Sequence, residues 1–505
     1  MEPSTHTNSQ TTPAERPQTA PAGPMFPPRK PWPVESGERR LLPISLALAF
    51  LAVWILLETF EQGQLIPGLG TAVLVAGWYG ALFLYRGSGG MERRVNQMLL
   101  AAVSLIAMTF ALFSNPWFRF WNSGALVLLT AVHTWELCGG GVLSWDRAGM
   151  LVERLGLLLG GPFVRLGAVG DAARSLKNRK EVGKWLPVLV GAGVSIPVLW
   201  LVAAVLMDAD AVFAMVAGEA LSWLEETFGT MLLRLVLALC AAPFLFSLLY
   251  FASHTERKPR EGRARPRWSS LTAVILLGAL DGLYLFFLVV QSAALFGDRS
   301  YLERAGISYA AYARSGFFQL VGLAGLNVAM ILLAVWLCRE DRRLRWLCTA
   351  LVALTGVLLV SAAWRMTLYV SAYGLSFKRC LTYWGMGMLA ALLVLTVLRV
   401  WKMDFPFFRW AAPIALAGWL LLNYCNVDAV TAHYNASRVA SGSLPQSAVD
   451  DLLHAGGGFD GLRPLAETAD PVILRWKRED AVRDCGSWTT WNLSAYLAVR
   501  EQTEE

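Results

Sequence analysis

Residues 270–290 read SLTAVILLGALDGLYLFFLVV, and Asp281 is the only charged side chain in this run. Lipid offers backbone groups no hydrogen-bond partners, so a spanning helix needs about twenty mostly apolar residues. Further runs of this kind begin near Leu41, Ile66, Met98, Asn122, Trp185, Thr230, Gly316, Trp346, Leu381 and Phe408. The sequence therefore predicts an all-α, polytopic transmembrane helix bundle of about eleven spans.

The composition of the chain also indicates a membrane protein. Of its 505 residues, 55% are hydrophobic and only 16% are charged, whereas soluble domains carry about a quarter charged residues. The 21 tryptophans fit this interpretation, since indole rings favour the headgroup boundary. This balance argues against a soluble globular fold.

The positions of the Lys and Arg residues predict the orientation of the spans. With a cytoplasmic N-terminus, 28 of those near the spans fall on the inner side. Only six fall in outer loops: Arg119, Arg299, Arg304, Arg314, Lys378 and Arg379. Because cytoplasmic loops carry the excess of Lys and Arg, we expect an N-in/C-out topology. The basic run Arg257–Arg267 then sets topology, with membrane lipids as its partners and no nucleic acid.

Three segments outside the predicted spans differ from them in composition. Residues 1–40 are rich in Pro, Ser and Thr and predict a disordered cytoplasmic tail. Within a transmembrane domain of residues 41–425, residues 142–184 space cations among Leu, Val and Gly, which predicts an amphipathic segment on the cytoplasmic face. Residues 426–505 predict a small extracytoplasmic C-terminal domain. It is expected to be mostly helical, because apolar residues recur at helical spacing in 447–454 and 491–499.

Two polar features lie near the predicted outer boundary before residue 250. The segment Ala211–Phe228 carries Glu219, Glu225 and Glu226, so it predicts an interfacial helix in place of a span. Arg234 follows near the outer end of the next span, where we interpret it as snorkelling towards the headgroups.

Asp281 is the candidate intramembrane polar site. It lies about twelve residues into its span, about 18 Å from the inner edge at the helical rise of 1.5 Å per residue. Ionisable groups at this depth are costly and often functional. One hypothesis is proton or cation coupling in a secondary transporter. The other is a paired or capped carboxyl that holds helices together, just as Asn327 is interpreted as an interhelical hydrogen-bonding residue.

No enzymatic or metal signature stands out. His133 and Glu136 have a spacing that two metal ligands could use, but no second pair accompanies them, so we expect no metal and no other cofactor. Phosphate-binding glycine loops are also missing. Glu58 and Glu61 begin the first outer loop, where polytopic glycosyltransferases that use lipid-linked sugars place acidic residues. Cys425 and Cys485 could pair if both face an oxidising compartment.

Three stretches resemble an uncharacterised bacterial membrane family, the domain of unknown function 4173, with 4153 as a relative. They are YAAYARSGFFQL from Tyr309, RMTLYVSAYGL from Arg365 and NVDAVTAHYN from Asn426. With the spans between them, they cover roughly residues 271–453. The resemblance implies a multi-pass protein of the bacterial cytoplasmic (inner) membrane without an assigned activity.

All three stretches fall on the outer side of the topology that charge predicts. We expect their polar and aromatic residues to meet at one extracytoplasmic surface that either docks the C-terminal domain or frames a ligand pocket. The residues are Tyr309, Tyr312, Arg314, Arg365, Tyr369, Tyr373, Asp428, Tyr434 and Asn435. This favours a non-enzymatic membrane protein that senses or scaffolds, with an extracytoplasmic or membrane protein as a further partner. The alternatives are a secondary transporter using Asp281 and a glycosyltransferase using Glu58 and Glu61.

Overall fold

The computed structural model describes residues 36–138, 156, 159–177, 202, 205, 206, 209, 211–254, 268–295, 317–339, 341–402, 404–454 and 457–504. Long helices dominate these residues, and extended pairing within them is confined to a single bridge between Trp268 and Cys338. An all-α architecture is thus confirmed for the described part of the chain. The predicted N-terminal tail lies outside it up to residue 35.

Eight helices of the described chain are long and apolar enough to cross a membrane. They are α1 (Ser36–Glu61), α2 (Leu69–Arg86), α3 (Arg94–Leu112), α8 (Ala211–His254), α9 (Ser270–Leu295), α12 (Phe317–Leu337), α13 (Arg342–Tyr373) and α14 (Phe377–Trp401). Each coincides with a predicted span. The protein is therefore a multi-pass membrane protein, because each helix satisfies its own backbone while offering apolar side chains to lipid.

The three remaining predicted spans are not matched by any of these eight helices. The helix α4 (Pro116–Leu137) forms where a span was expected but is not among the eight apolar helices. The helix α15 (Phe407–Tyr424) qualifies only together with α16 (Val427–Ala440), from which it is bent by 52°. The span predicted from Trp185 lies outside the described residues. The described residues thus support eight spans, or nine with the bent pair, so the expected count of about eleven stays a prediction.

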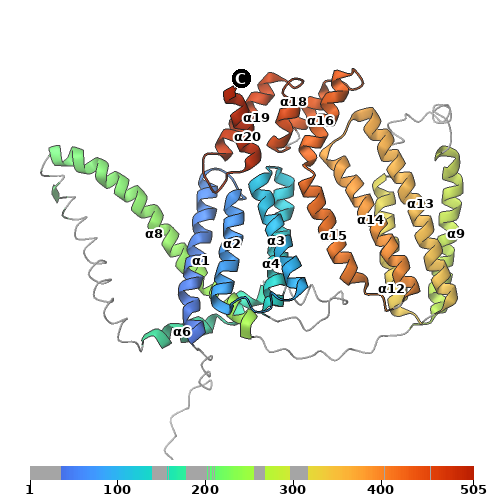
Figure 1. The fold of residues 1–505 in the computed structure, drawn as a ribbon, viewed down its shortest axis with the longest axis horizontal. Coiled ribbons are helices and arrows are strands. Elements are labelled where there is room, and N and C mark those ends of the chain that lie inside the picture. The colour runs from blue at the N-terminus through green and yellow to red at the C-terminus, as the bar shows by residue number, and fades with distance from the viewer. Residues whose placement is uncertain are drawn as a thin grey trace, which may run out of the picture.

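The long helix α8 includes the segment expected to lie at the interface. Residues 211–228 are helical and continue without a break into the candidate span Gly229–His254. In Figure 1 this helix slants away from the other helices towards its N-terminal end. Within the predicted amphipathic segment 142–184, the described helix α6 (Leu166–Lys177) buries Ala168 and Ala172 against the first hydrophobic core, and the side chain of Arg174 is exposed.

The membrane helices form two groups with separate cores. Helices α1, α2, α3, α4 and α8 pack around one core that contains Phe110, Phe246 and Leu249. Helices α9, α12, α13 and α14 pack around a second core that contains Ile331, Leu351 and Leu358. Figure 1 shows α15 between the two groups. Aromatic side chains of α4, α14 and α15 fill the junction: Trp117, Phe118, Phe377, Trp384 and Trp419.

The C-terminal segment, residues 426–504 of the described chain, is hereafter called the tail. It folds into short helices at one end of the bundle, the tail side (Figure 1). It comprises α16, α17 (Ser447–His454), the 3₁₀ turn η1 (Phe459–Gly461), α18 (Leu462–Leu465), α19 (Pro471–Asp484) and α20 (Leu493–Glu504). These helices pack around a small hydrophobic core that contains Val449, Leu465 and Ala481. The apolar spacing that indicated helices at 447–454 and 491–499 thus corresponds to α17 and α20.

Candidate functional site

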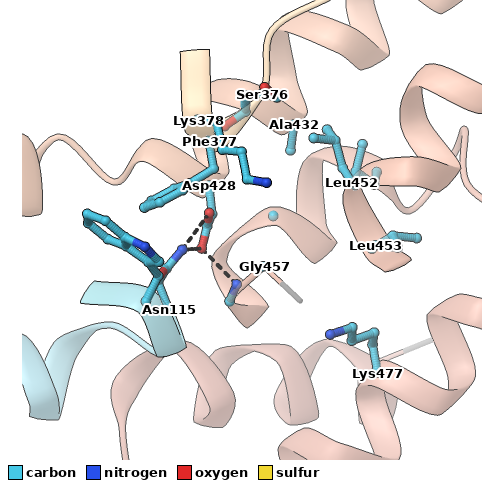
Figure 2. A pocket seen from close by; sticks show the side chains of 15 residues that line it. Asn115, Ser376, Phe377, Lys378, Asp428, Ala432, Leu452, Leu453, Gly457 and Lys477 are labelled. Carbon is cyan, nitrogen blue, oxygen red and sulfur yellow. Dashed lines mark hydrogen bonds between the residues drawn. The ribbon is translucent and has the colours of Figure 1, made fainter. Parts of the chain in front are cut away.

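A pocket of about 310 Å³ lies where the tail meets the bundle. This volume is at the lower end of the range for small-molecule sites. Figure 2 shows its walls coming from both parts of the chain. The lining residues are Asn115, Trp117, Ser376, Phe377, Lys378, Asp428, Thr431, Ala432, Leu452, Leu453, Gly457, Gly458, Gly461, Leu465 and Lys477. The first five belong to α4 and to the beginning of α14, and the others belong to the tail.

Asp428, one of the predicted site residues, organises the inner wall of the pocket. The Asn115 side-chain nitrogen donates to both carboxylate oxygens, at 2.9 and 2.8 Å, and the backbone N–H of Gly458 donates at 2.7 Å. Burial raises the pKa of Asp428 above the ordinary aspartate value, while these donors and the nearby Lys477 act in the opposite direction. The carboxylate therefore ties α4 to the tail.

Local sequence explains why Asn115 and Asp428 are available for this contact. Asn115 precedes Pro116 and caps α4, accepting the N–H of Phe118 at 3.0 Å, so its amide group stays at the helix end. At the end of α15, Asn426 adopts a left-handed conformation with φ of 47° and caps α16. This redirects the chain and places Asp428 in the first turn of α16, facing α4.

Gly458 allows the tail backbone to approach the bundle closely. A Cβ at this position would lie 2.7 Å from the Ser114 hydroxyl oxygen and 2.8 Å from both the Asn115 nitrogen and an Asp428 oxygen. The neighbouring N–H of Phe459 donates to Ser114 at 2.7 Å. Only a residue without a side chain fits this junction.

Two lysines give the pocket its cationic character. Lys378 is the second residue of α14 and Lys477 belongs to α19. Figure 2 shows their amino groups directed into the pocket from opposite walls. Among the described residues, no ion pair within 4.0 Å involves either lysine. Trp117, Phe377 and Leu465 add apolar lining, so the pocket suits a ligand with an anionic group and an apolar part.

Asn435, another predicted site residue, clamps the turn between α13 and α14. It accepts the N–H of Leu375 at 2.8 Å and donates to the carbonyls of Leu375 and Ala448, each at 3.0 Å. Gly374 has φ of 76°, and a Cβ there would lie 2.7 Å from the Asn435 side-chain oxygen. The second and third predicted stretches therefore meet through backbone contacts, which dock the tail.

The other predicted surface residues that the structure describes do not line the pocket. The rings of Tyr369 and Tyr373 are 5.0 Å apart, and the Arg379 guanidinium covers Tyr369 at 4.4 Å. Tyr434 packs on the second core and accepts a hydrogen bond from Arg438 at 3.0 Å. Arg365 is buried in α13, one turn before Tyr369. Tyr309, Tyr312 and Arg314 lie outside the described residues.

Glu58 and Glu61, which suggested a glycosyltransferase, pair with Arg234, and Glu58 also contacts the tail. Arg234 pairs with Glu58 at 3.1 Å and Glu61 at 3.3 Å, and its guanidinium also lies 4.3 Å from the centre of the Trp54 ring. The Ser487 hydroxyl donates to Glu58 at 3.3 Å. The snorkelling interpretation of Arg234 is thus replaced by ion pairing, because the buried guanidinium lies within reach of two carboxylates that are partly exposed.

The N-terminus of α2 also binds the tail. The backbone N–H groups of Gly68 and Leu69 donate to the carbonyls of Thr489 and Trp491, each at 2.8 Å. The Gly70 N–H also donates to the Thr489 carbonyl, at 3.1 Å. The first N–H groups of a helix have no partner within it, so the tail supplies partners for three N–H groups at this end. Nearby, Gln64 donates to Asp484 at 2.7 Å, and burial raises the pKa of Asp484.

The polar residues singled out within the bundle differ in their partners. Tyr284 donates to Asn327 and Asn327 donates to Thr355, both at 2.9 Å, which confirms Asn327 as an interhelical hydrogen-bonding residue. His133 is 2.8 Å from the Tyr79 hydroxyl. Asp281 is buried, and neither carboxylate oxygen has a hydrogen-bond partner within the described part of the chain.

Two further sequence hypotheses concerned metal binding and a disulfide. Among the described residues, no group of three or more His, Cys, Asp or Glu side chains is arranged to hold a metal. Cys425 and Cys485 are both free thiols in the structure, so the pairing that the sequence left open is not formed.

Asn115, Gly458, Lys378 and Lys477 were not identified as site residues from the sequence. The Asn-Pro pair at 115–116 and the glycine run at 456–458 were local signals for a cap and a close backbone approach. No local pattern indicated that α4, α14 and α19 would converge, because residues 115 and 477 are far apart along the chain.

Comparison with known proteins identifies the family. A family model described as Domain of unknown function (DUF4153) matches residues 100–456. The match begins well before residue 271, where the resemblance noted in the sequence started, and includes Asn115, Lys378 and Asp428. The likeness to the domain of unknown function 4173 stays a prediction. Neither the search of curated proteins nor the search of solved structures gave a match. Because the matched region is well over half of the chain, this multi-pass membrane protein belongs to the DUF4153 family of unknown function.

Proposed function

We propose that this protein is a non-enzymatic sensor that binds an anionic ligand in the pocket between its tail and its membrane bundle. The observation that carries the proposal is the pair of lysines, Lys378 from the bundle and Lys477 from the tail, directed into one pocket. An anion bound to both would connect the two parts. The tail side would face outward in a bacterial cytoplasmic membrane, following the predicted N-in/C-out topology of about eleven spans.

Ligand binding would act on the tail by mass action. A ligand that contacts both walls binds only the docked tail, so it shifts the population towards that state. The tail already has specific docking contacts through Asp428 with Asn115, through Asn435 with Leu375, and through the N-terminus of α2. A change in tail docking is therefore the output that this geometry favours for a sensor.

The test measures tail docking by hydrogen exchange on the full-length protein in nanodiscs. Inorganic phosphate and nanodiscs containing phosphatidylglycerol supply anions from solution and from the bilayer, and phosphatidylcholine nanodiscs provide the neutral reference. We expect one of these anions to protect residues 427–440 and 471–484, with the protection reduced several-fold in Lys378→Gln and Lys477→Gln.

The matched control is Lys402→Gln, which removes an exposed lysine at the other end of α14. This variant should keep the full response to the anion. Equal loss of protection in all three variants would show that net charge, and not the pocket, produces the response. A tail whose exchange is indifferent to both anions would count against the sensor.

Scaffolding is a second candidate, favoured by one feature of α19. Val472 and Trp476 lie one turn apart and are 60% and 65% exposed, in a helix that is otherwise rich in charged residues. Exposed aromatic and aliphatic neighbours of this kind commonly serve as contacts for a partner protein. A photo-crosslinking residue at position 476 should capture an extracytoplasmic or membrane protein in the native host, whereas one at exposed Asp480 on the same helix should not.

The two remaining alternatives differ in their support. Glycosyltransfer would need Glu58 or Glu61 free for catalysis, but their ion pairs with Arg234 argue for a structural role. Glu58→Gln is therefore expected to affect tail docking more than any transfer activity. The transporter alternative rests on Asp281, which would bind the coupled proton or cation.

A further inference from the structure

Asp281 lies on the single protein-facing stripe of α9. Leu277, Asp281 and Tyr284 are 2%, 9% and 5% exposed, which is the spacing of one helix face. Leu276, Leu283 and Phe286 lie on the other faces and are each about 60% exposed or more. The candidate span runs from Ser270 to Val290, so Asp281 is close to its middle and faces α13.

No group of the described structure neutralises this carboxyl. Neither oxygen has a hydrogen-bond partner, and no ion pair within 4.0 Å involves it. In the described ranges, the titratable side chains shown to interact with it are Tyr284 on α9 and Cys348 on α13, and neither carries a positive charge.

Tyr284, which lies one turn from Asp281 on α9, uses its hydroxyl donor elsewhere. The Tyr284 hydroxyl donates to Asn327, the Asn327 amide donates to Thr355, and the Thr355 hydroxyl donates to the Leu351 carbonyl. None of these hydrogen bonds involves Asp281. An ionised carboxylate would therefore be buried with neither a donor nor a counter-charge, whereas a protonated carboxyl avoids most of that cost.

We propose that Asp281 is a proton-binding site at the contact between α9 and α13, in the middle of the membrane. The neutral acid is the form that this site holds, and release of its proton leaves a charge that only a change in the packing of α9 or entry of water can stabilise. This property does not depend on the pocket at the tail. It supplies the chemistry that a proton-coupled transporter needs.

The test uses dicyclohexylcarbodiimide, an apolar reagent that partitions into bilayers and reacts with protonated carboxyl groups. The carboxyl gives its proton to a carbodiimide nitrogen while its oxygen bonds to the central carbon, and rearrangement leaves a stable N-acylurea. The full-length protein in lipid vesicles is treated between pH 6 and pH 9, and the adduct is located by mass spectrometry.

We expect Asp281 to be modified, and the modification to fall roughly tenfold for each pH unit above its titration midpoint. Asp341 is an internal control, because it caps α13 at the helix end and its two oxygens accept from the Arg343 N–H and the Ser270 hydroxyl. It should remain unmodified, and Asp281→Asn should remove the intramembrane adduct. Wild-type Asp281 that is unmodified at every pH, or equally modified throughout, would overturn the proposal.

A second measurement separates a proton site from a hidden ion pair. Asparagine closely matches the shape of a neutral carboxyl, so Asp281→Asn should unfold at the wild-type temperature or above it at neutral pH. A variant that unfolds well below the wild type would mean that Asp281 is ionised and paired, which contradicts the proposal. Neither result bears on the lysine pocket, so this inference and the proposed function fail independently.

Discussion

Gly458 illustrates, for a single residue, how closely the tail approaches the bundle. Its backbone N–H binds Asp428, and three atoms of Ser114, Asn115 and Asp428 occupy the space that a side chain would need. At the neighbouring Gly457, a Cβ would meet its nearest atom at 3.6 Å, an ordinary contact. Two adjacent glycines therefore have different structural requirements.

We expect Gly458→Ala to destabilise tail docking by about 1–3 kcal/mol, the usual cost of forcing a methyl group into a packed site. Gly457→Ala should change it by less than about 0.5 kcal/mol, as for substitutions without a steric conflict. Hydrogen exchange of α16 and α19 in the two variants measures the difference. Equal effects would show that Gly458 is not in close contact with α4.

Asn435 is the second residue whose removal should have a defined effect. Its amide makes three hydrogen bonds, two to Leu375 and one to Ala448. We expect Asn435→Ala to cost about 1–3 kcal/mol, because these backbone groups lose their partner in a partly buried contact. His433→Ala on the exposed face of α16 is the control. Thermal unfolding in detergent compares them, and equal melting temperatures would contradict the clamp.

At the scale of elements, the tail helices carry three aspartates that respond to pH together. Burial raises the pKa of Asp428, of Asp460 and of Asp484 above the ordinary aspartate value. An acid with a raised pKa in the folded state binds more protons when folded than when unfolded. Its contribution to stability is therefore full below the ordinary pKa of about 3.9 and is lost as pH rises through the raised value.

We therefore expect tail docking to be more stable in mild acid than at neutral pH. Hydrogen exchange of α16, α19 and α20, corrected for intrinsic rates, should show greater protection at the lower pH. Asp484→Asn should weaken this pH dependence while keeping one acceptor for Gln64. Protection that increases with pH would mean that the ionised carboxylates stabilise docking.

For the whole molecule, the two groups of membrane helices are joined in two places. Within the bundle, α15 and the aromatic side chains around Trp419 lie between them. On the tail side, the C-terminal segment contacts α2 of the first group and the α13–α14 turn of the second. The tail thus bridges both groups. A relative movement of the groups would therefore change the shape of the pocket between the tail and the bundle.

The orientation of the whole molecule is testable with single-cysteine proteins. In a background without other cysteines, Cys425, which is exposed on the tail side, should react with a membrane-impermeant maleimide added to intact cells. Arg343→Cys, exposed at the other end of the bundle, should react only after permeabilisation. The reverse pattern would contradict the N-in/C-out topology, since the two positions lie on opposite sides of it.

The sequence alone determined the class of the protein and the positions of most membrane helices. This was possible because lipid imposes a local requirement, a run of apolar residues long enough to span it. The sequence predicted the spans less well where polar residues interrupt the apolar run, as in α4, or where the chain bends, as between α15 and α16. The mid-span position of Asp281 was likewise readable from the sequence, whereas its lack of a partner was not.

Only the tertiary structure decided which polar residues share a site. Asp428 and Asn435 were singled out from their stretch, but their partners Asn115, Gly458 and Leu375 come from elements distant in sequence. The two lysines share a pocket because the tail folds back across the ends of α4 and α14. Such convergence depends on helix packing and chain direction, which composition and periodicity do not encode.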